Sequence, residues 1–243
     1  MSFDLGIFET TLRDGLKAWN LPCDAKTLAA MGQFSLEIIE VNQGLNLTRI
    51  VEPTEMAVKN FLDSLSLLLL QLPTELNVLD VGTGAGFPGI PLAISRPQWS
   101  IVLLDSLRKR LNFLDEASQK LGLDNVVTLH ARAEDVGQDA KHRESYDLVV
   151  SRAVANLPVL LELCSPLVKV GGRFIAFKSG EARQELTASQ VALEKLNMEL
   201  EQTFDLELPL SMGERTLLVF RKIGATPSVY PRRAGLPSKR PLL

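Results

Sequence analysis

Three glycines alternate with other residues in the segment Asp80-Val81-Gly82-Thr83-Gly84-Ala85-Gly86. Glycine lets the backbone turn sharply and lets a ligand approach it closely, so this spacing is suited to binding a small organic molecule. The surroundings support that use, because residues 77–81 predict a short buried strand and residues 90–94 predict the start of a helix. The segment therefore predicts a cofactor site beyond the carboxyl end of a strand.

The residue that follows the third glycine separates the possible cofactors. A dinucleotide-binding fingerprint has glycine at its first, third and sixth positions, and here the sixth position is Phe87. No Gly-Lys-Ser/Thr follows, which excludes a phosphate-binding P-loop. The alternation of Gly82, Gly84 and Gly86 after Asp80 is instead the form found in class I methyltransferases, and it predicts S-adenosylmethionine. A nicotinamide or nucleotide enzyme with a similar turn is the alternative.

Two later positions fit the same cofactor. Asp105 ends the next predicted strand, 25 residues after Asp80, and a carboxylate there can accept two hydrogen bonds from a ribose diol. Ala133 and Glu134 follow the third predicted strand and are placed to contact an adenine ring. We therefore expect one ligand to lie across the ends of three neighbouring strands.

The elements that position these residues alternate between strands and helices. The predicted strands are 77–81, 100–105, 126–130, 146–152 and 173–178, and the predicted helices begin at 90 and span 108–121, 157–167 and 184–196. Such alternation indicates a mostly parallel sheet with helices on both faces. Strands at 204–208 and 216–221 have no full helix between them and are predicted to pair as a hairpin at the sheet edge. The prediction is an α/β, Rossmann-like class I methyltransferase fold with a seven-stranded sheet.

Three regions are predicted along the chain. Apolar residues recur at helical spacing over the first 45 residues, and Pro53 can occupy the first turn of a further helix. Residues 1–72 are therefore predicted to form an N-terminal helical extension, residues 73–224 the Rossmann-like domain, and residues 225–243 a basic C-terminal tail.

Composition restricts the compartment and the partners. With 46% hydrophobic and 23% charged residues, the 243-residue chain has the balance of a globular protein. No apolar run approaches the roughly 18 residues of a membrane helix, and no secretory signal is recognised, so a cytoplasmic protein without a membrane partner is expected. Cys23 and Cys164 have no metal-ligating neighbours, and neither a disulfide framework nor a metal site is expected. The overall acidity is compatible with a monomer.

Charge is distributed unevenly. Residues 215–243 hold seven of the 26 basic residues and none of the 29 acidic ones. Such an end can bind RNA phosphates or can be a solvated, disordered tail, and charge alone leaves both interpretations open. The final residues also lack the apolar pattern needed to pack by themselves.

Several strings outside the glycine segment resemble one protein family over nearly the whole chain. The most specific are Gly86-Phe87-Pro88-Gly89-Ile90-Pro91 and Ser151-Arg152-Ala153. The others are residues 46–48, 61–65, 104–110, 132–135, 213–215 and 230–237. Together they resemble the bacterial RsmG (GidB) family of 16S ribosomal RNA guanine-N7 methyltransferases.

The resemblance implies a reaction, a partner and a set of site residues. The family methylates N7 of guanine 527 in the 530 loop, so 16S ribosomal RNA or the 30S subunit is the implied partner. By position, the implied cofactor contacts are Gly82, Phe87, Asp105, Ser106, Leu107, Ala133, Glu134 and Arg152. The implied active-site residues are Asn46, Asp63, Arg110, Arg152 and Arg215. The family often has histidine at the position of Asn60, so a required histidine is doubtful here, although Asn60 could still bond to a base edge.

Methylation at guanine N7 has modest chemical requirements. N7 carries a lone pair and no proton, so the enzyme needs no general base but must place N7 about 3–3.5 Å from the methyl group. Guanine presents N7 and O6 as adjacent acceptors that arginine can read, and we hypothesise that Arg110, Arg152 or Arg215 does so. For Arg110 and Arg215 the alternative is a phosphate or a structural carboxylate. Lys178, at a predicted strand end, is expected to be a surface lysine or to touch phosphate.

Other functions remain open on these patterns. A methyltransferase of small molecules would leave the basic end without a role. A non-catalytic RNA-binding assembly factor would not need the intact glycine segment, Asp105 and Arg152. Amino-group methylation is disfavoured because Ser151-Arg152-Ala153 stands where an Asn/Asp-Pro-Pro-aromatic turn would be, and Cys164 lies among apolar residues, unlike a nucleophile.

Overall fold

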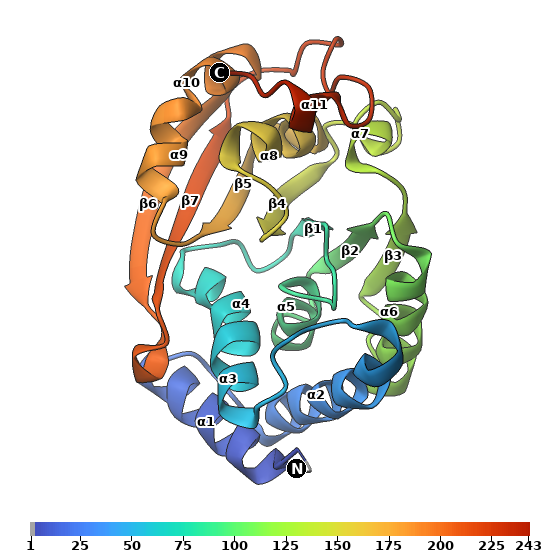
Figure 1. The fold of residues 1–243 in the computed structure, drawn as a ribbon, viewed down its shortest axis with the longest axis vertical. Coiled ribbons are helices and arrows are strands. Elements are labelled where there is room, and N and C mark those ends of the chain that lie inside the picture. The colour runs from blue at the N-terminus through green and yellow to red at the C-terminus, as the bar shows by residue number, and fades with distance from the viewer. Residues whose placement is uncertain (1–2) are drawn as a thin grey trace.

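A seven-stranded sheet forms the centre of the computed structural model, which describes residues 3–243 (Figure 1). The strand order is β3-β2-β1-β4-β5-β7-β6, and only the pairings of β7 with β5 and β6 are antiparallel. The strands are β1 Asn77–Val81, β2 Ser100–Asp105, β3 Val126–His130, β4 Tyr146–Arg152, β5 Val168–Lys178, β6 Met198–Glu207 and β7 Glu214–Lys222. The predicted Rossmann-like sheet with a late antiparallel hairpin is confirmed.

Helices cover both faces of the sheet. One face packs against α5 (Gly89–Ser95) and α6 (Arg108–Leu121), and their apolar residues share a core with the N-terminal helices. The other face packs mainly against α8, with α7, α9 and α10 nearby. These helices are α7 Ala133–Val136, α8 Leu157–Cys164, α9 Ala182–Ala188 and α10 Gln190–Lys195. The carboxyl ends of β1 to β5 therefore open between two helical layers.

The N-terminal helices end close to the glycine segment. Helices α1 (Leu5–Ala18) and α2 (Ala25–Leu45) are followed by α3 (Pro53–Met56), which has proline in its first turn as predicted. A π-helical stretch, η1 (Ala57–Leu62), then leads into α4 (Asp63–Leu65) and the 3₁₀ turn η2 (Ser66–Leu69). An aromatic contact joins this region to the glycine segment, because the rings of Phe61 and Phe87 lie 5.2 Å apart.

Several predicted boundaries differ from the structure, including the start of β6, which lies at Met198 instead of residue 204. β5 begins at Val168 instead of residue 173, because a bulge in its pairing with β4 accommodates the glycines that predicted a turn. The single helix predicted for residues 184–196 is two helices that meet at Ser189. The Ser189 hydroxyl donates to the Glu185 carbonyl at 2.7 Å, and such local bonds compete with helix continuation.

The basic end of the chain packs against the domain. Residues 225–243 lie along α8 and include the short helix α11 (Leu236–Lys239). Leu242 is buried in the same core as α8, so the lack of an apolar repeat did not prevent packing. Over residues 3–243, no helix is long and apolar enough to cross a membrane.

Candidate functional site

The glycine segment adopts a backbone that favours glycine at each alternate position. Gly82, Gly84 and Gly86 have φ angles of +75°, +61° and +97°, a region that side chains disfavour. A Cβ atom on Gly82 would overlap the Val154 side chain, and one on Gly86 would lie 2.7 Å from Leu114. The segment must therefore be free of side chains both for its own conformation and for its neighbours.

Asp80 supports this segment from beneath. It is fully buried, and its Oδ2 accepts from the Gly89 amide at 2.9 Å, which ties β1 to the first turn of α5. Burial raises the pKa of Asp80 to about 6. The structure thus places Asp80 under the loop, as a support for the residues that face the cavity above.

Asp105 holds two loops together at the end of β2. Its Oδ2 accepts from the Gly84 amide at 3.0 Å, and its Oδ1 accepts from the Leu107 amide at 2.8 Å. Arg110 approaches the same carboxylate, with Nη1 3.4 Å from Oδ2. Since a carboxylate has about four acceptor positions, Asp105 retains capacity for a ligand.

A cavity of about 390 Å³ lies above these loops, and we call it the cofactor cavity. Its lining includes the predicted residues Gly82, Asp105, Ser106, Arg110, Ala133 and Glu134. Val154, Leu163 and Ser238 also line it, and the sequence patterns did not indicate them. Leu107 is 52% exposed and is not among the lining residues.

A second cavity, of about 690 Å³, opens between the N-terminal helices and the ends of β4, β5 and β7. We call it the arginine cavity. Its polar lining comes mainly from Asn60, Asp63, Arg152, Lys178, Glu185 and Arg215. These residues come from η1, α4, α9 and three strands, so only the folded chain brings them together.

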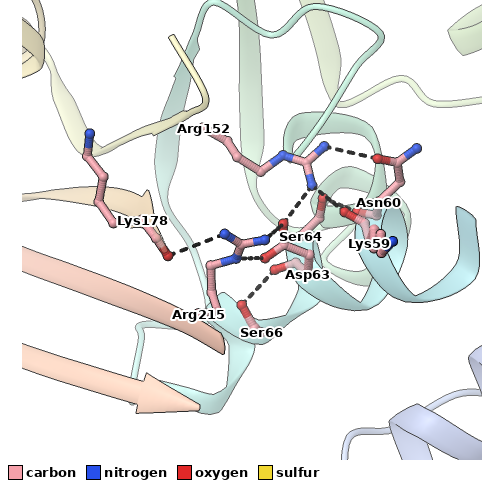
Figure 2. A network of polar contacts seen from close by, with 8 residues as sticks. All are labelled: Lys59, Asn60, Asp63, Ser64, Ser66, Arg152, Lys178 and Arg215. Carbon is pink, nitrogen blue, oxygen red and sulfur yellow. Dashed lines mark hydrogen bonds and ion pairs between the residues drawn. The ribbon is translucent and has the colours of Figure 1, made fainter. Parts of the chain in front are cut away.

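Asp63 pairs with both arginines of this cavity. Figure 2 shows Arg152 and Arg215 reaching it from two sides. Arg215 donates from Nε to Oδ1 at 2.6 Å and from Nη2 to Oδ2 at 3.0 Å, and Arg152 donates from Nη1 to Oδ2 at 2.9 Å. The Arg152 Nη1 also donates to the Lys59 carbonyl at 2.9 Å. A buried carboxylate thus fixes two guanidinium groups in one orientation.

Lys178 is not a surface lysine, which corrects the more ordinary expectation. It is only 9% exposed because its ammonium donates to Glu185 at 2.6 Å and to the Ala155 carbonyl at 2.9 Å. Asn60 is similarly buried, and its Nδ2 has no hydrogen-bond partner within residues 3–243. The lining of the cavity therefore combines three paired cations with an asparagine whose amide donor is buried and unpartnered.

The structure separates the predicted active-site residues into groups. Asp63, Arg152 and Arg215 lie together in the arginine cavity, whereas Arg110 lines the cofactor cavity. Asn46 is exposed, caps the end of α2 in a left-handed conformation, and lines neither cavity. Phe87 is buried, with the Arg152 guanidinium 5.2 Å from its ring centre.

The two cavities meet at Ala153. This residue follows β4, has a φ of +57° and lines both spaces. A molecule in one cavity can therefore approach a molecule in the other at this point. Among residues 3–243, no group of three or more His, Cys, Asp or Glu residues could hold a metal ion.

Solved structures share the fold of this chain. The chain superposes on a mutant of the 16S rRNA (adenine(1408)-N(1))-methyltransferase from Catenulisporales acidiphilia with a TM-score of 0.52 and 16% identity, covering 63% of this chain and 87% of that one. It superposes on M. jannaschii TYW2 in complex with AdoMet with a TM-score of 0.52 and 16% identity, over 67% of this chain and 76% of the other. The fold and the glycine segment are those of a class I S-adenosylmethionine-dependent methyltransferase.

Sequence comparison identifies the family. The model of the GidB family, described as rRNA small subunit methyltransferase G, matches residues 27–213. A ribosomal RNA small subunit methyltransferase G from Desulforamulus reducens is 46% identical over 233 residues, 96% of this chain and 97% of the relative. One from Pelotomaculum thermopropionicum is 45% identical over 239 residues, 98% of this chain and 100% of the relative. The chain belongs to the rRNA small subunit methyltransferase G family.

Proposed function

We propose that the protein transfers a methyl group from S-adenosylmethionine to N7 of guanine 527 in the 530 loop of 16S ribosomal RNA. The observation that carries the proposal is the meeting of two different cavities at Ala153. One has the glycine segment and a carboxylate at its floor, and the other has two oriented guanidinium groups. A methyl donor and a nucleobase can thus be placed with their reacting atoms adjacent.

The cofactor cavity fits S-adenosylmethionine by the chemistry of its lining. Asp105, Ala133 and Glu134 line the cavity, where Asp105 would accept from the ribose diol and Ala133 with Glu134 would form a wall for the adenine. The Val154 side chain occupies the space that a Cβ atom on Gly82 would take, so a side chain at Gly82 would displace this wall of the cavity. When bound, S-adenosylmethionine supplies a methyl group activated by a positively charged sulfur.

The arginine cavity fits a guanine whose N7 is the nucleophile. Arginine is the usual reader of the guanine N7 and O6 edge, but the N7 lone pair must point at the methyl group for transfer. We therefore propose that Arg152 or Arg215 donates to O6 and to the RNA backbone, leaving N7 free. Asp63 and Glu185 are engaged with these cations and with Lys178, which is compatible with a reaction that needs no general base.

Asn60 completes this proposal as a second contact to the base. Asn60 lines the arginine cavity, and its Nδ2, which is buried in the unliganded chain, has no partner among the described residues. An unsatisfied buried donor is costly, so a ligand acceptor would be favoured there. A guanine splayed out of an RNA loop presents such acceptors to the protein, whereas the deep, narrow major groove of an RNA helix keeps them out of reach of side chains.

The remaining parts of the proposal concern the partner and the compartment. The exposed side chains of Arg233 and Arg240 lie on the C-terminal segment, where they can meet phosphates of 16S ribosomal RNA in the 30S subunit. We propose that the protein acts on this RNA as a cytoplasmic monomer without a metal ion.

Incubation with methyl-labelled S-adenosylmethionine tests the proposed function. Parallel reactions contain 30S particles, naked 16S ribosomal RNA, or no RNA. Label in 7-methylguanosine is expected only in the reactions with RNA. Label recovered in a small molecule would favour the small-molecule alternative, and RNA binding without any transfer would favour a non-catalytic assembly factor.

A further inference from the structure

The C-terminal segment is held on the domain by a buried carboxylate. Glu162, in the middle of α8, is fully buried and accepts three bonds from Arg232: from the backbone amide at 2.9 Å, from Nε at 2.8 Å and from Nη2 at 2.5 Å. Arg143 adds bonds to the carbonyls of Thr226 at 2.6 Å and Tyr230 at 2.8 Å. The path of this segment is therefore fixed by side chains of the domain, although the segment is rich in charge.

Two of the residues that hold the segment belong to the cofactor cavity or adjoin it. Leu163, directly after Glu162, lines the cofactor cavity. Glu134 lines it as well, and its Oε1 accepts from the Gly235 amide at 2.9 Å. Gly235 begins α11 with a φ of +80°. The segment thus turns into a short helix directly at the wall where the adenine is expected.

Ser238 on α11 reaches this wall. It lines the cofactor cavity together with Ala133 and Glu134. The residue is exposed to solvent as well as lining the cavity, and its hydroxyl has no hydrogen-bond partner among residues 3–243. A serine hydroxyl can both donate and accept, and the edge of adenine offers an amino donor beside ring-nitrogen acceptors. The two groups are chemically matched.

We infer that Ser238 hydrogen-bonds to the adenine edge of the cofactor and that α11 forms the outer wall of the adenine site. The inference rests on the proposed use of this cavity for S-adenosylmethionine. It gives the C-terminal segment a role in cofactor selection, separate from any contact of its exposed arginines with RNA. Glu134 bonds to Gly235 at the start of α11. The position of Ser238 therefore depends on the packing of the C-terminal segment against the domain.

Calorimetric titration with S-adenosylhomocysteine tests the inference without RNA. Ser238→Ala removes one hydrogen bond and is expected to weaken binding about fivefold. Ser238→Phe places a bulky ring at the same wall and is expected to weaken it roughly tenfold or more. Ser228→Ala is the matched control, because Ser228 is an exposed serine of the same segment outside the cavity, and its dissociation constant should equal that of the wild type.

A second ligand separates a contact to adenine from a general effect on the cavity. S-inosylhomocysteine has an oxygen in place of the adenine amino group, so the preference for the adenine ligand should shrink in Ser238→Ala. Equal affinities of wild type and Ser238→Ala would overturn the inference, as would an unchanged preference between the two ligands. No binding to the wild-type chain would overturn the proposed function as well, which distinguishes the two failures.

Discussion

Replacing Asp63 with asparagine removes the charge that faces two guanidinium groups while it keeps the size of the side chain. Asp63 is 1% exposed and accepts bonds of 2.6 and 3.0 Å from Arg215 and 2.9 Å from Arg152. Breaking a buried ion pair by removing one partner costs about 3–5 kcal/mol. The side chains of Arg152 and Arg215 remain 15% and 18% exposed, so water offsets part of the loss, and we expect about 3 kcal/mol.

Urea-induced unfolding followed by circular dichroism measures this loss. With a slope of about 3 kcal/mol per molar urea, Asp63→Asn should lower the midpoint by about 1 M at an unchanged slope. The control is Asp14→Asn, which disrupts the ion pair between Asp14 and Arg13. These side chains are 70% and 54% exposed, so the substitution should leave the midpoint nearly unchanged. Methyl transfer to RNA should also fall by roughly 10²-fold, because the guanidinium groups lose their fixed positions. A variant that unfolds at the wild-type midpoint would refute the reasoning.

Three further substitutions test other parts of the account. Gly82→Ala adds a Cβ atom that overlaps the Val154 side chain, at a position where φ is +75°. The variant should bind S-adenosylhomocysteine roughly tenfold more weakly than the wild type. Equal affinities of the two proteins in calorimetric titration would contradict this expectation. Burial raises the pKa of Asp80 from 3.8 to about 6, so the folded state keeps a proton that the unfolded state releases, and stability falls as pH rises through this window. Between about pH 4 and pH 7, the free energy of unfolding should therefore fall less in Asp80→Asn than in the wild type, by up to about 3 kcal/mol. Urea midpoints that change equally in both proteins between these pH values would contradict this. Arg232→Ala leaves the buried Glu162 without its cation and should destabilise the chain by about 3–5 kcal/mol, which an unchanged calorimetric melting temperature would disprove.

The order of elements in the sheet and the glycine segment could be predicted because their signals are local. Apolar strands followed by glycines and by helices report the Rossmann-like topology directly. The start of β5 could not be predicted, because it depends on a bulge in the pairing with β4. The break between α9 and α10 could not be predicted either, because it depends on the hydrogen bond of the Ser189 hydroxyl. These depend on pairing and packing that a single segment does not encode.

The candidate site was predictable only in part for the same reason. The pairing of Asp63 with Arg215 joins residues 152 positions apart, and no spacing rule connects them. Lys178 resembled a surface lysine because its partner Glu185 meets it only once α9 turns back over the strand end. The C-terminal segment packs through contacts with distant residues, among them the bond of Arg232 to the buried Glu162 and the bonds that Arg143 donates to backbone carbonyls of the segment. A glutamate inside an apolar helix was a local signal of this contact, but it did not indicate which cation would pair with it.

Methyl transfer to 30S particles reconstituted with site-specifically altered 16S ribosomal RNA tests the central claim most directly. The RNA is prepared twice, once with guanine at position 527 and once with 7-deazaguanine, in which a C–H group replaces N7 and the rest of the base is unchanged. The account predicts that 30S particles reconstituted with the guanine RNA accept one methyl group at this position and that those with the 7-deaza RNA accept none. Equal methylation of both RNAs, or methylation of another nucleotide, would contradict the claim that guanine N7 is the nucleophile.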